Sequence, residues 1–197
     1  MPLNTGSSGQ ASPTAEARAS LEECVTLNIS VGDRWGLGLG YQGFGRVAQA
    51  QGQHIDAVEM YSKGLKTFTE LGARWDVARA LAEMGRSLFA LGNDAEAGRV
   101  WHEAFQIASE TQGAHVALEA LVGIARLKAK QGHLEYALEL ILIVMSNPAS
   151  VQETKDRANH LYAELEAQLT KPQVEAVKER ARSKSLDEIV RHVLAEM

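Results

Sequence analysis

Apolar residues recur along most of the chain at the three- and four-residue spacing that places side chains on one face of an α-helix. The segments 75–90 and 95–110 show this spacing most clearly. Gly92 lies between them, where a helix end favours a left-handed residue without a side chain, and Asn93 and Asp94 are good helix starters. The pattern therefore predicts two consecutive helices joined by a tight glycine turn.

This two-helix pattern returns with a period of 40 residues, once lengthened to 41. Five sets of positions share the period: Gly32, Gly72 and Gly113; Gly52, Gly92 and Gly132; Ala17, Ala57, Ala97 and Ala137; Leu21, Tyr61, Trp101 and Ile141; and Tyr41, Leu81, Leu121 and Leu161. Five sets in phase are hard to obtain by chance. A fixed period of this size is typical of a solenoid, in which similar helix pairs stack and bury a continuous core.

The residues around each turn carry a family resemblance. Two units share the same pattern: a large apolar residue with a glycine after it, then a second glycine, an alanine and an aromatic residue at fixed spacing. The residues are Phe44-Gly45, Gly52, Ala57 and Tyr61 in one unit, and Met84-Gly85, Gly92, Ala97 and Trp101 in the next. This spacing resembles the tetratricopeptide repeat, in the lengthened form of bacterial signal-transduction ATPases and maltose-regulator-type transcription activators. The junction at 32–36 and the chain end, 169–170 and 182–188, are similar to that subgroup as well.

The resemblance covers residues 14–197 and implies an all-α fold, a right-handed α-solenoid of antiparallel helix pairs. It also implies that the chain is the C-terminal sensor part of a larger regulator, since neither an ATPase phosphate loop nor a DNA-binding helix-turn-helix is recognisable. The predicted organisation is a half repeat at 14–31, full repeats at 32–71, 72–112 and 113–148, and a degenerate repeat with a cap at 149–197. The stretch 1–13, rich in Gly, Ser, Asn and Pro, is expected to be disordered or an artificial addition.

Three start signals divide the degenerate end. Ser150 and Glu153 have the spacing of a capping box, and so do Ser185 and Glu188. Thr170 precedes a Lys-Pro pair that is expected to open a short helix ending near Arg182. Four residues of the final helix are predicted to face the core: Ile189, Val190, Val193 and Leu194.

Composition excludes several classes of function. A net charge of −5 gives no help to nucleic-acid binding, which requires clustered Lys and Arg. The longest apolar run, 137–145, is half the length of a membrane span. Cys24 is the one cysteine and has no partner for an internal disulfide, so a reducing, cytoplasmic setting is expected.

The segment 38–43 matches the dinucleotide-binding pattern G-x-G-x-x-G. That motif needs a strand before it and a helix N-terminus after it, whereas the same register in the next repeat, 78–83, is plainly helical. The glycines are therefore predicted to lie inside a helix, which should be the least stable of the array. They allow either close approach of a neighbouring helix or ligand, or simple packing of small residues; the second interpretation is favoured.

The sharper candidate is a row of arginines, Arg46, Arg86 and Arg126, at a spacing of 40. In this repeat type the position is expected to face the concave side. The same face should carry Gln42, Gln49, Arg79, Phe89, Glu119 and Lys130. The row suits a protein or peptide partner with acidic groups, because a guanidinium offers a planar fork of donors to a carboxylate. The alternative is that these arginines pair with Glu or Asp of adjacent repeats.

The N-terminal edge is incomplete, since the helix at 14–30 lacks the partner that would precede it. Leu21, Cys24 and Val25 would then be uncovered on one side. Either upstream repeats were removed or another chain covers the edge, which makes a homodimer an alternative. Trp35 and Trp75, at equivalent helix starts, are predicted to pack between repeats.

No catalytic or metal-binding pattern is recognisable among the six histidines, Cys24 and the acidic residues, so neither an enzyme nor a cofactor is predicted. Three hypotheses remain. The favoured one is a non-catalytic module that binds a protein or peptide in its concave groove. The second is a small-molecule sensor, and the third is a structural or oligomerisation arm.

Overall fold

The protein is described by a computed structural model, which covers residues 13–184 and 186–195. These residues form helices and no strand. The helices are α1 (Pro13–Val31), α2 (Arg34–Ala50), α3 (His54–Glu70), α4 (Arg74–Ala90), α5 (Asp94–Glu110), α6 (Ala114–Lys130), α7 (Leu134–Ser146), α8 (Gln152–Glu166), α9 (Lys171–Ser183) and α10 (Leu186–Ala195). Of the predicted tail at 1–13, residues 1–12 lie outside the described residues and Pro13 begins α1. Ser185 of the second predicted capping box lies outside them as well.

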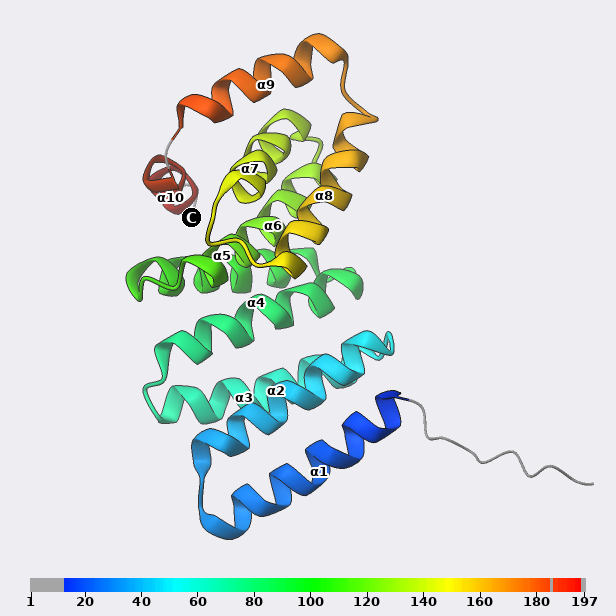
Figure 1. Cartoon of the computed structure of the whole chain (residues 1–197), viewed down its shortest axis with the longest axis vertical. Helices are drawn as coiled ribbons and strands as arrows, with labels where there is room; N and C mark the ends of the chain where they lie inside the picture. Colours follow the sequence, from blue (N-terminus) through cyan, green and yellow to red (C-terminus); the bar gives the residue numbers. More distant parts are fainter. Residues whose placement is uncertain (1–12, 185, 196–197) are drawn as a thin grey trace, which may run out of the picture.

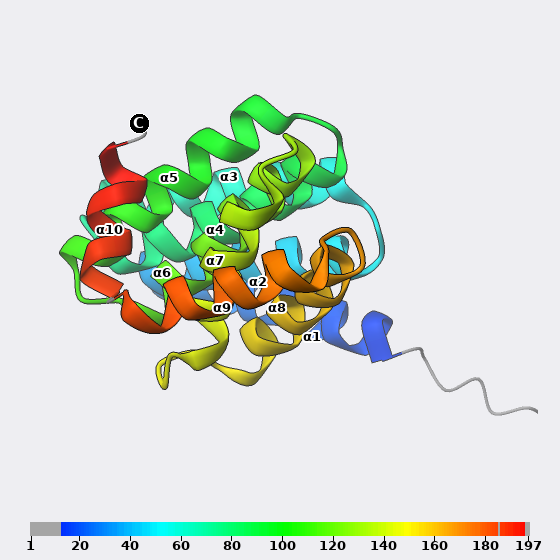
Figure 2. The same cartoon turned by 90° about the horizontal axis from the view of Figure 1, so that it is seen from above.

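From α1 to α7, each helix packs antiparallel against the next, and the helices stack along the long axis of the molecule (Figure 1). Helices α2, α4, α6 and α8 also contact one another in turn, which makes them one layer. In the view along the stack, α3 and α5 lie on one side, and α2 and α8 lie on the other (Figure 2). The predicted all-α solenoid of helix pairs is confirmed. None of the described helices combines the length and the apolar character needed to cross a membrane.

Glycine turns end the helices at five of the predicted positions, because Gly32, Gly52, Gly72, Gly92 and Gly132 all have positive φ. The turn between α5 and α6 differs, since Gln112 takes the left-handed conformation with φ 56. Gly113 follows as the residue before α6, with φ −81. A Cβ on Gly113 would lie 3.2 Å from Trp75 Cδ1, so close packing accounts for this glycine. The single 41-residue spacing thus reflects an exchange of roles between two neighbouring residues.

Replacing Gln112 by glycine is expected to raise the free energy of unfolding by about 0.5–1 kcal/mol, because a side chain in the left-handed region is strained and glycine is not. Urea denaturation followed by circular dichroism measures the change. The matched control is Gln131→Gly at the end of α6, where φ is −79 and glycine adds only backbone entropy to the unfolded chain. Equal effects of the two substitutions would contradict this account.

Aromatic side chains of the second helices insert at glycines of the first helices. A Cβ on Gly45 would lie 2.7 Å from Tyr61 Cε1, and one on Gly38 would lie 2.7 Å from Phe68 Cε1. The entire 38–43 motif lies inside α2, as predicted. Its glycines admit side chains of both α1 and α3, so close approach of neighbouring helices explains them better than the favoured interpretation of small-residue packing.

The Trp101 side chain packs against two such glycines at once, Gly85 of α4 and Gly123 of α6. It is 1% exposed, its indole Nε1 donates to Ala82 O at 3.1 Å, and a Cβ on Gly85 or Gly123 would overlap its ring. The tryptophan of α5 thereby fixes how closely α4 and α6 approach each other.

Gly123→Ala is expected to lower the free energy of unfolding by about 1–3 kcal/mol, since the added Cβ would overlap the Trp101 ring and force it to shift away from its hydrogen bond to Ala82 O. Thermal or urea unfolding measures the loss. Gly98→Ala is the matched control, because its added Cβ would meet only the flexible tip of Leu127, so alanine's higher helix propensity is felt instead. A loss at Gly98 as large as that at Gly123 would refute the role of Trp101.

In the degenerate repeat predicted at 149–197, the first helix does not start with the capping box that the sequence suggests. Helix α8 begins at Gln152 after Val151 and has no side-chain cap, so the predicted capping box of Ser150 and Glu153 is wrong. The hydroxyl of Ser150 donates instead to Val144 O at 2.5 Å, which ties the connecting loop to α7. Glu153 is left free to face other helices.

The next start signal is confirmed, since the Thr170 amide donates to Gln173 Oε1 at 3.0 Å and α9 follows directly. Helix α9 crosses the end of the stack, and α10 returns beside α5 (Figure 1). Ile189 and Val193 are buried as predicted, whereas the side chains of Val190 and Leu194 lie outside the described set. Glu139 of α7, 4% exposed, pairs with Lys184 and holds the cap in place.

Candidate functional site

The predicted arginine row lies on the layer formed by α2, α4, α6 and α8. Arg46, Arg86 and Arg126 occupy equivalent positions on the first three of these helices. Their side chains differ in exposure, at 61%, 26% and 34% respectively. The row is therefore partly accessible at both ends and mostly covered in the middle.

Arg86 is the centre of an ion-pair network. It pairs with Glu83 on its own helix, lies 3.8 Å from Glu119 of α6 and 3.6 Å from Glu153 of α8, and donates to Gln49 of α2. Its buried Nε has no hydrogen-bond partner among the described residues. One guanidinium thus links the first helices of four successive units.

Glu153 closes the network on the side of α8. Its Oε1 lies 3.1 Å from Arg157, and its Oε2 lies 3.8 Å from Arg46. Arg157 also donates to Glu119 at 2.9 Å. Sequence analysis missed Glu83 and Arg157 and assigned Glu153 to a cap. The available signal was the Glu–Arg pairs three and four residues apart, 83 with 86 and 153 with 157, since such pairs share a helix face.

Each arginine of the row lies near a carboxylate of another unit. Arg86 pairs with carboxylates of adjacent units, as the structural alternative expects. Arg46 lies 3.8 Å from Glu153 and Arg126 lies 3.7 Å from Glu164, contacts of similar length, but both side chains are more exposed than that of Arg86. A partner-binding role for the row stays a prediction, and its accessible cations are these two.

Two adjoining cavities lie along this face and share Arg86. One, of about 240 Å³, is lined by Phe89, Trp101, Val122 and Gly123 together with Arg86, Glu119, Arg126 and Arg157. The other, of about 440 Å³, is lined by Arg46, Gln49, Ala50, His54, Arg86 and Glu153. The first has apolar walls beside cations, and the second is mainly polar. His54 Nδ1 in the second cavity is a further buried atom without a partner among the described residues.

A larger hollow, about 620 Å³, lies along α5 and the end of α6. Its charged side chains are already paired, Arg99 with Glu103 at 3.0 Å and Asp94 with Lys130 at 2.7 Å. His102, whose buried Nε2 has no hydrogen-bond partner among the described residues, lines it as well. The arginine row does not line this hollow, so we place the candidate site at the two smaller cavities.

The other predicted groove residues divide into two groups. Gln49, Phe89 and Glu119 line the cavities. Gln42, by contrast, is buried and donates to Asp76 O at 3.4 Å, and Arg79 pairs with Asp76. Gln42 thus joins α2 to α4, whereas the Arg79 pair lies within α4, and neither side chain lines the cavities.

Lys130 lies beside the first cavity rather than in it. Its Nζ is 5.0 Å from the centre of the Phe89 ring. Its ion pair with Asp94 ties the end of α6 to α5.

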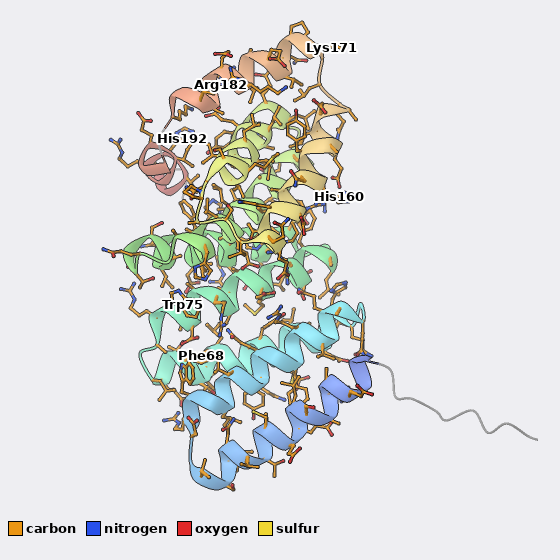
Figure 3. All side chains as sticks on the ribbon, viewed as in Figure 1. Phe68, Trp75, His160, Lys171, Arg182 and His192 are labelled. Atoms are coloured by element: carbon orange, nitrogen blue, oxygen red, sulfur yellow. The ribbon has the colours of Figure 1, made fainter. Side chains whose placement is uncertain are left out.

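The predicted packing tryptophans differ in burial. Trp75 is partly buried, 5.4 Å from the His115 ring, with the Arg79 guanidinium 4.9 Å from its own ring centre. Figure 3 shows Phe68 and Trp75 at the side of the stack where α3 turns into α4. Trp35 is 50% exposed, and its indole N–H donates to Asp76 at 2.9 Å across the repeats.

The edge helix α1 uses two of its predicted residues against α2. Leu21 and Val25 are partly buried at Gly43 and Gly40. Cys24 is exposed, and so is a set of larger apolar side chains: Leu27, Ile29 and Val31. Homodimerisation through this edge stays a prediction.

Burial raises the pKa of Glu119 to about 8, and the neighbouring carboxylates of Glu83 and Glu153 act in the same direction. The Glu119 side chain is only 13% exposed, and this burial outweighs the opposite effect of the arginines beside it. The surroundings of this carboxyl therefore favour its protonated form more than water does.

Because the folded pKa lies above the ordinary value near 4.5, protonation favours the folded state, and this contribution is lost as pH rises from about 4.5 through 8. The unfolding free energy of the wild type should fall relative to that of Glu119→Gln over this window. Urea titrations at several pH values measure the difference. Glu59→Gln on α3, at an exposed site, should run parallel to the wild type; parallel curves for Glu119→Gln would contradict the raised pKa.

No group of three or more side chains suited to a metal ion occurs in the described part of the chain. A scan against models of known protein families finds no match, and a search of curated proteins finds no relative. What the structure supports is a helical-repeat solenoid of successive helix pairs, compatible with the tetratricopeptide arrangement.

Proposed function

We propose that the chain is a tetratricopeptide-type repeat domain that binds a protein or peptide segment on its concave face without catalysing a reaction. The observation that carries the proposal is the cavity in which Phe89, Trp101 and Val122 meet the guanidiniums of Arg86 and Arg126. An apolar side chain with a carboxylate beside it would fit both features. Partly exposed arginines next to aromatic residues are common at the centres of protein interfaces.

The accessible cations can exchange partners at small cost. Arg126 lies 3.7 Å from a Glu164 side chain that is itself 41% exposed. Exposed pairs of this kind contribute about 0.2–1 kcal/mol, so a carboxylate on a ligand can replace Glu164 without unfolding the repeat. Arg46 has the same freedom at the other cavity.

A peptide fits better than a metabolite. The apolar cavity holds about 240 Å³, less than the roughly 300–1,000 Å³ typical of small-molecule sites. It continues past Arg86 into the polar cavity, which gives an elongated surface across α2, α4, α6 and α8. The resemblance to bacterial signalling regulators supports a sensor or scaffold role in a larger cytoplasmic protein.

The test uses amidated ten-residue peptides that carry one Phe and one Asp, one to four residues apart, in a Gly-Ser background. Amide chemical-shift changes of the ¹⁵N-labelled chain report binding even at millimolar affinity. Shifts should concentrate on α4 and α6 around Phe89 and Val122. Arg126→Glu should weaken binding about fivefold or more, since a like charge replaces an ion-pair partner worth about 1 kcal/mol.

Arg99→Glu on α5 is the matched control, because Arg99 is exposed and outside both cavities. Peptides with Asn in place of Asp should bind more weakly. Equal shifts from the Asn peptides, or shifts scattered outside α4 and α6, would refute the proposal. Binding of 3-phenylpropionate in preference to every peptide would favour a small-molecule sensor instead.

A further inference from the structure

Glu153 links α8 to helices far from it in the chain. Helix α8 packs against α6 and α7, yet this one carboxylate lies within 3.8 Å of Arg46 on α2 and within 3.6 Å of Arg86 on α4. It also pairs with Arg157 at 3.1 Å. Three guanidiniums from three helices thus surround a side chain that is 58% exposed.

The fold does not depend on Glu153 at this position. If it leaves, Arg86 keeps Glu83, Glu119 and Gln49, and Arg157 keeps Glu119 at 2.9 Å. Arg46, at 61% exposure, would be solvated by water. The start of α8 has no side-chain cap that involves Glu153. The carboxylate can therefore swing out while the helices around it stay folded.

We infer that Glu153 is a built-in competitor for ligand: its carboxylate occupies the arginine site of the free domain, holds α8 toward α2, and gives way to an acidic side chain of a bound protein segment. The inference rests on the proposed function for its ligand, whereas the link between α8 and α2 stands on the ion pairs alone.

Charge complementarity supports an acidic ligand at this place. With Glu153 displaced, the cluster holds the three guanidiniums of Arg46, Arg86 and Arg157 against two carboxyl groups, those of Glu83 and Glu119. The unpartnered Arg86 Nε points to unused donor capacity in the same cluster. An Asp or Glu on a ligand supplies the missing charge.

The first test measures the link without any ligand. Nitroxide labels at Q51C, the exposed residue at the end of α2 outside the cavities, and at N159C on α8, in a C24S background, give the distance between the helices by double electron–electron resonance. Glu153→Gln should lengthen or broaden the distance distribution. So should 1 M NaCl in the parent chain, where the screening length falls to about 3 Å.

Arg46→Gln is the second variant and should have the same effect, because it removes the other end of the link. Glu59→Gln, which removes an equally exposed carboxylate from α3, should leave the distribution unchanged. Circular dichroism verifies that each variant is folded. Unchanged distances in both folded variants, Glu153→Gln and Arg46→Gln, would overturn the inference.

The second test measures competition with the Phe-Asp peptides described above, whose amidated ends leave the Asp as their only carboxylate. Removing an ion-pair competitor worth about 1 kcal/mol should tighten binding to Glu153→Gln about fivefold, with no gain for Glu59→Gln. Equal affinity for wild type and Glu153→Gln would overturn the competitor role but leave the proposed function intact. Absence of acidic-peptide binding to either chain would overturn both.

Discussion

The structure depends on the insertion of aromatic side chains at glycines of neighbouring helices. Trp101 lies against Gly85 and Gly123, Tyr61 against Gly45, and Phe68 against Gly38. Each contact requires that the facing residue have no Cβ, so it sets the separation of two helices. A buried aromatic side chain removes about 150–250 Å² from water, which makes these contacts major contributors to the stability of the stack.

The polar network follows from that packing. Because Trp101 brings α4 and α6 together, Arg86 and Glu119 come within ion-pair distance, and the cavity beside them is walled by the same tryptophan. A network with one largely buried part and one exposed part can have two purposes. The buried pairs align the helices, since an unpaired charge there would be costly. The exposed pairs, at Arg46, Arg126 and Glu153, are weak enough to change partners.

A binding module of this kind gains specificity from competition as much as from attraction. A free domain whose arginines are already paired with its own carboxylates discriminates against weakly acidic or purely apolar segments, because only a stronger carboxylate contact displaces the internal one. The elongated face across α2, α4, α6 and α8 would allow an apolar anchor and an acidic group of the ligand to be recognised together.

The sequence by itself determined the helices, the glycine turns and the period, because hydrophobic spacing and positive-φ glycines are local properties that each repeat carries in full. It also placed Arg46, Arg86 and Arg126 on equivalent helix positions, and Phe89 and Glu119 beside them. Only the tertiary structure decided which of these arginines is accessible, and that Glu153, more than 100 residues beyond Arg46, faces it across the stack. The exchange of roles between Gln112 and Gly113 was decided there too. The physical reason is that the relative position of distant helices depends on every packing angle between them, and contacts of aromatic rings with glycines set those angles. No local sequence pattern specifies their combined effect.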